Sequence, residues 1–170
     1  MILIGIGSNL AAPQFASPHD TVAAAVRQLP AIGAAVAACS RWYLSQPVPP
    51  SDQPWYINAV AVVETGLAPA RLLAALLALE ARLGRRRGAP DAARTLDLDL
   101  LDYDERQYDT RRLILPHPRL HERRFVLAPL AEIAPHWRHS RLGLTAAELL
   151  AGLPAGQPVR ALGDLDAPRG

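Results

Sequence analysis

Two aspartates spaced two residues apart carry the clearest chemical signal in the chain. Residues 92–101 have the sequence AARTLDLDLL, and this alternation predicts a β-strand whose leucines share one face while Asp97 and Asp99 share the other. Neighbouring carboxylates repel each other unless a cation lies between them or one of them is protonated. Mg²⁺ prefers carboxylate and phosphate oxygens, so the pair predicts a magnesium-nucleotide site. A strand with a solvated outer face is the alternative.

Arginines crowd the segments on either side of this acidic pair. All 18 basic residues of the chain are arginine, so any bound phosphate must be held by guanidinium groups, which favour two-pronged contacts. Their density predicts a triphosphate with Mg²⁺, whereas arginines that cap a helix and stay solvated are the alternative. The arginines concerned are Arg85, Arg86, Arg87, Arg94, Arg112, Arg119, Arg123 and Arg124.

A second group of residues is aromatic or carries an amide. Trp55, Tyr56 and Phe125 could enclose a flat heterocycle, and Asn58 could read its edge through paired donors and acceptors. The loop 46–54 contains four prolines, which stiffen it and suit it to holding a ligand. Packing of the aromatic rings in the core is the alternative interpretation.

Several enzyme classes are excluded by what the chain lacks. The segment 5–9, GIGSN, has no Gly-Lys-Ser/Thr ending, so it is not a phosphate-binding P-loop. His117 and His121 have helical spacing, but Pro118 between them disfavours a helical zinc site. Cys39 is the single cysteine, which excludes an intramolecular disulfide and fits a reducing compartment. No Gly-x-Ser-x-Gly nucleophile motif is present.

The order of the expected elements predicts an α+β fold. Strand, helix, two strands, helix and the aspartate-bearing strand follow one another, which is the βαββαβ order of a ferredoxin-like antiparallel sheet flanked by helices. The C-terminal part adds a hydrophobic stretch and a further helix. The ranges are 1–7, 17–29, 33–44, 56–65, 69–83 and 92–101 for the core, then 126–133 for the stretch and 145–150 for the helix.

The length of 170 residues and a hydrophobic content of 50% fit a single domain, which we expect to span residues 1–163 with a frayed tail over 164–170. The net charge of +2 gives no reason to expect nucleic acid as a partner. The N-terminus lacks the basic region of a signal peptide, and no apolar run is long enough to span a bilayer. We therefore expect a cytoplasmic protein with no membrane partner.

At this point the motifs resemble one family, the 6-hydroxymethyl-7,8-dihydropterin pyrophosphokinases of folate biosynthesis. The resemblance extends from about residue 4 to 135, and the string RTLDLD at 94–99 is its most specific part. It implies a ferredoxin-like core and transfer of the pyrophosphoryl group of ATP to the pterin hydroxymethyl, with release of AMP. The other motifs are GIGSNL at 5–10, QPWYINAV at 53–60, ET at 64–65, LE at 79–80, GR at 84–85, PHPRL at 116–120, Arg123, Phe125 and PL at 129–130.

Carried over residue by residue, the resemblance implies roles for the acidic and basic residues and for the aromatic group. Asp97 and Asp99 would bind two Mg²⁺ ions and, with Arg85 and Arg94, would form the catalytic group, the arginines lying in a lid over 85–94. ATP would contact Glu80, Arg85, Arg87, Arg94, Leu100, Arg112, His117 and Arg123. The reduced pterin would contact Ser45, Pro47, Val48, Tyr56, Asn58 and Phe125. The enzyme is expected to be a monomer.

The chain departs from the family pattern in three places. The segment 88–93 lacks the tryptophan that relatives often carry there, Leu77 replaces a common polar residue, and Pro118 replaces a frequent aromatic. A non-catalytic homologue that binds a pterin or a nucleotide is therefore one alternative. An unrelated Asp-x-Asp transferase acting on a nucleotide sugar is another, and selective binding of a pterin would exclude it.

Overall fold

A six-stranded antiparallel sheet organises the molecule. The computed structural model describes residues 1–85 and 93–163. In the sheet the order is β5-β1-β4-β3-β8, and β2 pairs with β4 along the same edge as β3. The strands are β1 (Ile2–Ser8), β2 (Ala35–Cys39), β3 (Tyr43–Ser45), β4 (Tyr56–Glu64), β5 (Asp97–Tyr103) and β8 (Val159–Ala161); β6 (Tyr108–Asp109) and β7 (Ile114–Leu115) form a separate hairpin.

Strand β1 lies at the centre of this sheet because both of its edges are paired. Its apolar residues cover both faces, since Ile4 and Ile6 belong to the cluster under α1 and α2, whereas Leu3 belongs to the cluster on the opposite face. A strand that is buried on both sides is expected to be an unbroken apolar run, and residues 2–6 fit that pattern.

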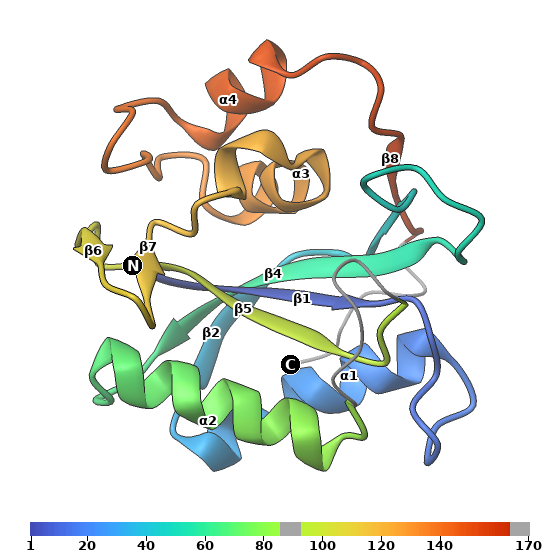
Figure 1. Ribbon diagram of the computed structural model, residues 1–170. Helices are drawn as coiled ribbons and strands as arrows, with labels where there is room; N and C mark the ends of the chain where they lie inside the picture. Colours follow the sequence, from blue (N-terminus) through green and yellow to red (C-terminus); the bar gives the residue numbers. More distant parts are fainter. Residues whose placement is uncertain (86–92, 164–170) are drawn as a thin grey trace.

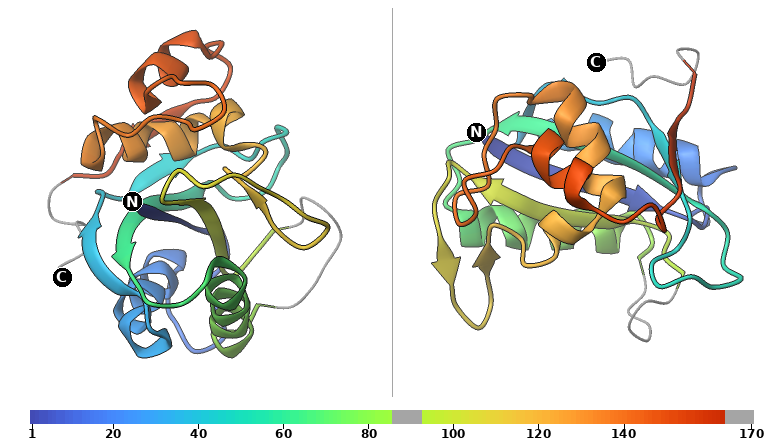
Figure 2. Two further views of the ribbon diagram at one scale, coloured as in Figure 1. Left: turned by 90° about the vertical axis from the view of Figure 1, so that its left-hand side faces the viewer. Right: turned by 90° about the horizontal axis from the view of Figure 1, so that it is seen from above.

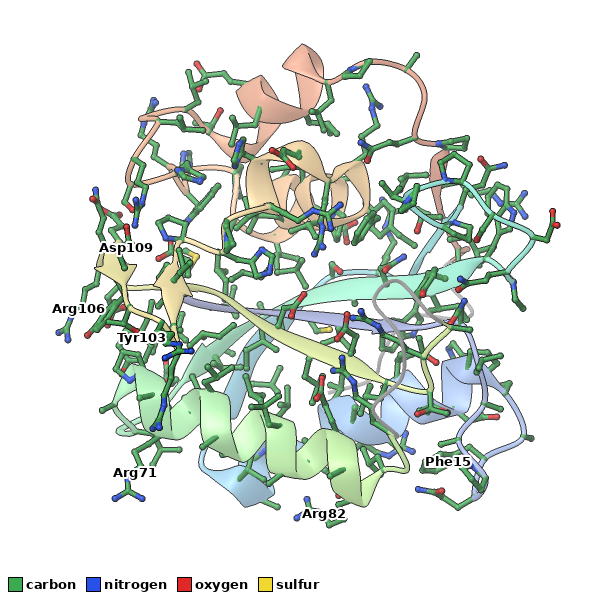
Figure 3. The ribbon with its side chains drawn as sticks, viewed as in Figure 1. Phe15, Arg71, Arg82, Tyr103, Arg106 and Asp109 are labelled. Carbon is green, nitrogen blue, oxygen red and sulfur yellow. The ribbon has the colours of Figure 1, made fainter. Side chains whose placement is uncertain are left out.

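Two helices cover one face of the sheet, α1 (Pro18–Gln28) and α2 (Pro69–Arg82) (Figure 1). Helix α1 begins as its sequence predicts, because the Ser17 side chain accepts a hydrogen bond from the Asp20 amide and Pro18 follows it. Helix α2 buries Leu72, Leu76 and Leu79 on one side, and Figure 3 shows Arg71 and Arg82 pointing outward from the helix.

The opposite face is covered by α3 (Arg124–Ile133) and α4 (Ala146–Gly152), so the sheet lies between two helical layers (Figure 2). Short 3₁₀ turns, Pro30–Ile32 and Leu120–Glu122, follow α1 and precede α3. Helix α4 begins with a reciprocal capping box between Thr145 and Glu148. Within the described residues, no helix has the length and apolarity needed to cross a membrane.

The structure confirms the βαββαβ core and corrects the expected strand 33–44. That segment forms two strands, β2 and β3, separated around Ser40. Between the two strands a side chain takes part in the pairing with β4, because the Ser40 hydroxyl accepts a hydrogen bond from the Val60 amide at 3.1 Å. Strand β8, which extends the sheet beyond β3, and the hairpin β6–β7 were not expected.

A register shift in β5 limits the predicted alternation. Ile4 pairs with Leu100 but Leu3 pairs with Asp102, which leaves Leu101 as an extra residue. Asp102 is consequently turned toward the α3 layer, where its Oδ2 accepts a 2.6 Å hydrogen bond from Trp137 Nε1. Strict alternation would have placed Asp102 on the α2 side.

Candidate active site

A cleft opens on the α3 side of the sheet, where β1, β4 and β5 meet the start of α3. Its volume is about 750 Å³ when the space at its open mouth is included. One end is charged and the other carries aromatic and amide side chains. The charged end is the group Arg94, Asp97, Asp99 and Arg123, and the uncharged end is the group Ser45, Gln46, Pro47, Val48, Pro49, Tyr56, Asn58 and Phe125. The lining is completed by Gly5, Ile6, Gly7, Ala59, Leu101 and Val126.

Asp97 and Asp99 lie on the same face of β5, as the alternation predicts, and both line the cleft. They are paired with Gly7 and Gly5 of β1, respectively. A side chain at Gly7 would stand 3.3 Å from Asn58 Oδ1, so glycine allows the amide of Asn58 to approach the backbone of β1. Gly7 therefore leaves room between Asp97 and Asn58, whereas a Cβ at Gly5 would meet the Leu101 side chain at 3.3 Å.

A chain of ion pairs fixes the charged end from behind. Arg85 Nη1 donates to Glu80 Oε1 and to Asp97 Oδ1, the latter at 2.7 Å. Arg94 Nη1 donates to Asp97 Oδ2, also at 2.7 Å. Both oxygens of Asp97 are thus occupied by arginines, and an anionic ligand could replace the carboxylate as their partner.

Glu80 is not among the residues that line the cleft, and the nucleotide contact implied for it stays a prediction. Its carboxylate is buried between α2 and β5, where Oε1 also accepts the Leu98 amide at 2.7 Å. Burial raises the pKa of Glu80 to about 7 against the opposing effects of the Leu98 amide and Arg85. This geometry makes Glu80 the support of Arg85.

Asp99 lies near Arg123, which also lines the cleft, and near His117, which is not among the lining residues. Arg123 Nη1 lies 3.5 Å from Asp99 Oδ2, and His117 Nε2 lies 4.0 Å from the same oxygen. Burial, followed by the charge of Asp97, raises the pKa of Asp99 above its ordinary value. The charged form of Asp99 is therefore disfavoured by its burial and by its acidic neighbour, and a bound cation would offset both.

His117 is neutral at pH 7, because burial, with a smaller effect of Arg123, lowers its pKa to about 4. Its Nδ1 accepts the Arg119 amide at 3.2 Å, so the ring proton must be on Nε2. His117 therefore presents an uncharged donor toward Asp99 and the charged end.

The uncharged end is held by hydrogen bonds to the sheet. Asn58 is buried, and its Nδ2 donates to Ser45 Oγ at 2.9 Å and to the Tyr43 carbonyl at 3.3 Å. The Arg123 guanidinium lies over the Phe125 ring, 5.5 Å from its centroid. Arg123 consequently contacts both ends of the cleft.

Three expected nucleotide contacts lie elsewhere or outside the described residues. The Leu100 side chain is buried on the α2 side of β5, so only its backbone could meet a ligand. Arg112 lies in the exposed turn between β6 and β7 and does not line the cleft. Arg87, like most of the expected lid over 85–94, falls outside the described residues; Arg85 and Arg94 at its two ends are described.

Comparison with known proteins shows to which family the chain belongs. The model of the family "7,8-dihydro-6-hydroxymethylpterin-pyrophosphokinase (HPPK)" matches residues 3–135. The chain belongs to the HPPK family. It is 41% identical over 149 residues to a 2-amino-4-hydroxy-6-hydroxymethyldihydropteridine pyrophosphokinase of Synechocystis sp., covering 87% of this chain and 73% of the relative. For the Pseudomonas aeruginosa protein of the same name the identity is 41% over 156 residues, 90% of this chain and 91% of the relative.

A solved structure supports the fold of this HPPK-family chain. The Plasmodium falciparum HPPK-DHPS wild type with SDX-DHP superposes with a TM-score of 0.63 at 13% identity. The match covers 88% of this chain and 43% of that one, so the present chain corresponds to less than half of the longer protein. At this identity the likeness concerns the fold alone, and it agrees with the ferredoxin-like core.

Proposed function

We propose that this HPPK-family chain transfers the pyrophosphoryl group of ATP to 6-hydroxymethyl-7,8-dihydropterin and releases AMP. The observation that carries the proposal is the division of a single cleft into a charged end with two carboxylates and an uncharged end with stacking rings and an amide. The first suits a metal-bound triphosphate and the second a flat heterocycle.

The carboxylates suit Mg²⁺ rather than a metal held entirely by protein. In the described part of the chain, no group of three or more His, Cys, Asp or Glu residues could enclose a metal ion. Mg²⁺ needs only one or two carboxylates when substrate phosphates and water supply its remaining ligands, and Asp97 and Asp99 share one face of β5. We propose that Asp97 and Asp99 hold two ions, which neutralise charge on the phosphate oxygens when bound.

The arginines would exchange Asp97 for phosphate when the nucleotide binds. Arg85 and Arg94 are about a quarter exposed in their present ion pairs, so the exchange does not require them to leave a dry core. Arg123 and the Nε2–H of His117 would add donors from the α3 side. We propose that these four residues bind and orient the triphosphate.

The pterin would lie between Tyr56 and Phe125, with its edge against Asn58. Asn58 keeps its Nδ2 on Ser45 and Tyr43, which leaves Oδ1, above Gly7, to accept from the ligand. Val48 can offer a backbone amide, whereas Pro47 can offer only its carbonyl. These fixed groups would set the position of the hydroxymethyl oxygen.

In the proposed reaction, the hydroxymethyl oxygen forms a bond to the β-phosphorus of ATP. The bond from that phosphorus to the oxygen bridging to the α-phosphate breaks, AMP leaves with this oxygen, and the hydroxymethyl proton is released. The side chains contribute by alignment and by stabilising charge on the phosphate oxygens. Since one chain supplies both ends of the cleft, we propose a cytoplasmic monomer with one catalytic domain over 1–163.

An AMP-formation assay with ATP, Mg²⁺ and the hydroxymethyl dihydropterin tests the proposal. We expect AMP to appear only when all three are present, and no transfer when a nucleotide sugar replaces ATP. Binding of both substrates without AMP would identify a non-catalytic homologue instead. Failure to bind the pterin in calorimetry would contradict the assignment of the uncharged end.

A further inference from the structure

Asn9, just after β1, connects the two ends of the cleft from behind. The residue is 1% exposed and does not line the cleft itself. Its side chain joins segments that are remote in sequence, one 44 and 45 residues away and the other 85 residues away. A buried amide that bridges two distant segments can set their separation.

The first segment contains Arg94. Asn9 Oδ1 accepts the Arg94 amide at 2.7 Å, and the amides of Asn9 and Leu10 both donate to the Arg94 carbonyl at 3.1 Å. Three hydrogen bonds thus fix the backbone of the residue whose guanidinium contacts Asp97.

The second segment leads into β4. Asn9 Nδ2 donates to Gln53 Oε1 and to the Pro54 carbonyl, both at 3.2 Å. Two residues after Pro54 comes Tyr56, which lines the uncharged end. Because Oδ1 faces a backbone donor and Nδ2 a backbone carbonyl, the orientation of the amide is determined by its partners.

We propose that Asn9 is a positioning residue that holds the phosphate end and the pterin end in register for transfer. The inference rests on the proposed function. Each end keeps its own binding groups without Asn9, so each substrate should still bind. What is lost is the fixed distance between the reacting atoms, to which the rate of an in-line transfer is sensitive.

The decisive variant is Asn9→Ala, with kcat for AMP formation and the Kd of each substrate measured separately. We expect kcat to fall about 10- to 100-fold, in keeping with a displacement of about 1 Å, while each Kd changes by less than about threefold. Asn9→Asp keeps an acceptor for Arg94 but turns a carboxylate oxygen toward the Pro54 carbonyl, so its kcat should be intermediate. Gln53→Ala removes one partner only and should lower kcat least.

Thr21→Val is the matched control. Thr21 is fully buried, and its hydroxyl accepts the Ala12 amide and donates to the Ser17 carbonyl in the loop that follows Asn9, away from the cleft. It should lower the Tm without lowering kcat. Equal losses of kcat and of both affinities in Asn9→Ala, or an equal loss of kcat in Thr21→Val, would show that Asn9 is merely structural.

Two further outcomes keep the inference separate from the proposed function. If Asn9→Ala does not fold, unchanged kcat in both Asn9→Asp and Gln53→Ala overturns the inference. A wild-type chain that binds both substrates but forms no AMP overturns the proposed function. If the wild type is active but the Asn9 variants lose kcat and both substrate affinities equally, only the inference is overturned.

Discussion

The two ends of the cleft satisfy their polar groups in different ways. At the charged end, Arg85 and Arg94 are paired with Asp97, and Arg123 lies beside Asp99, so the partners are themselves site residues. At the uncharged end, Asn58 is anchored to β3 by groups that need not move. On the proposed function, a nucleotide would therefore exchange partners at one end, whereas a pterin would find the other end already formed.

This difference separates binding from chemistry. A preformed pocket loses little free energy to rearrangement, so its side chains should act mainly on affinity. Ion pairs that reorganise around phosphate can be strongest in the transition state, so their loss should act mainly on rate. Substitutions at the two ends should therefore differ in whether they change affinity or rate.

The largest effect is expected from the carboxylates. Asp97→Asn and Asp99→Asn should each reduce AMP formation on the order of a thousandfold, because each removes an oxygen ligand that stabilises charge in the transition state. Asp99→Asn should not lower the Tm in Mg²⁺-free buffer, since it relieves repulsion from Asp97. Asp109→Asn in β6, labelled in Figure 3, is the control. Near-normal activity of both variants would remove the metal site from the proposal.

The arginines come next. Arg85→Ala and Arg94→Ala should lower kcat about 100-fold while the Kd of a non-hydrolysable ATP analogue rises much less, because the phosphate contacts strengthen as charge develops. Arg71→Ala, whose side chain points outward from α2 (Figure 3), should change neither quantity. If the Kd of the analogue rises by as large a factor as kcat falls, the arginines supply ordinary ground-state binding.

At the uncharged end, Asn58→Ala should weaken pterin binding about 5- to 150-fold and leave binding of the ATP analogue unchanged. A ligand donor left without its acceptor costs roughly 1–3 kcal/mol, which sets this range. Ser45→Ala removes only the support of the amide and should cost less. Equal losses for pterin and nucleotide in calorimetry would contradict the division between the two ends.

The smallest effect concerns stability and lies away from both ends. His139 is buried beside the His121 ring and Arg141, and burial followed by these two charges lowers its pKa. Below about pH 6.5 His139 binds a proton more strongly in the unfolded chain than in the folded chain. The free energy of unfolding should therefore fall as the pH falls. The slope from this group cannot exceed about 1.4 kcal/mol per pH unit.

Denaturant titrations between pH 5 and 7.5 measure the total slope, to which His117, with its pKa lowered to about 4, also contributes. His139→Gln keeps an acceptor near the Arg141 amide but cannot be protonated, so its slope should be smaller than that of the wild type. His136→Gln, at an exposed position, is the matched control. A slope unaffected by His139→Gln would mean that other groups cause the acid sensitivity.

The parts of the fold that repeat a local pattern could be predicted from the sequence. The capped helix α1, the helix α2 and the shared face of Asp97 and Asp99 all follow from periods of 3.6 or 2 residues. Placing the carboxylates beside Tyr56, Asn58 and Phe125 also agrees with the expectation, although their roles as ligands of metal and pterin stay proposals.

The features that depend on contacts between distant parts of the sequence could not be predicted. Strand β8 has three residues, too few to show alternation, and it pairs with β3 more than a hundred residues earlier. The register shift that turns Asp102 over arises between β5 and β1, so no window of one strand contains it. Glu80 and Asn9 belong to recognised motifs, but only the structure shows which neighbours use their oxygens.

Strand β8 has a consequence for the design of inhibitors. It lies beyond residue 135, where the family match ends, yet Val159 pairs with Ser45, and the Gln46 amide donates to the Pro158 carbonyl at 3.3 Å. Arg160 lies over the Trp55 ring, 5.9 Å from its centroid. A pterin mimic extended past Gln46 would therefore reach side chains that the shared family core does not supply. Selectivity among relatives is better sought at this strand than at the carboxylates.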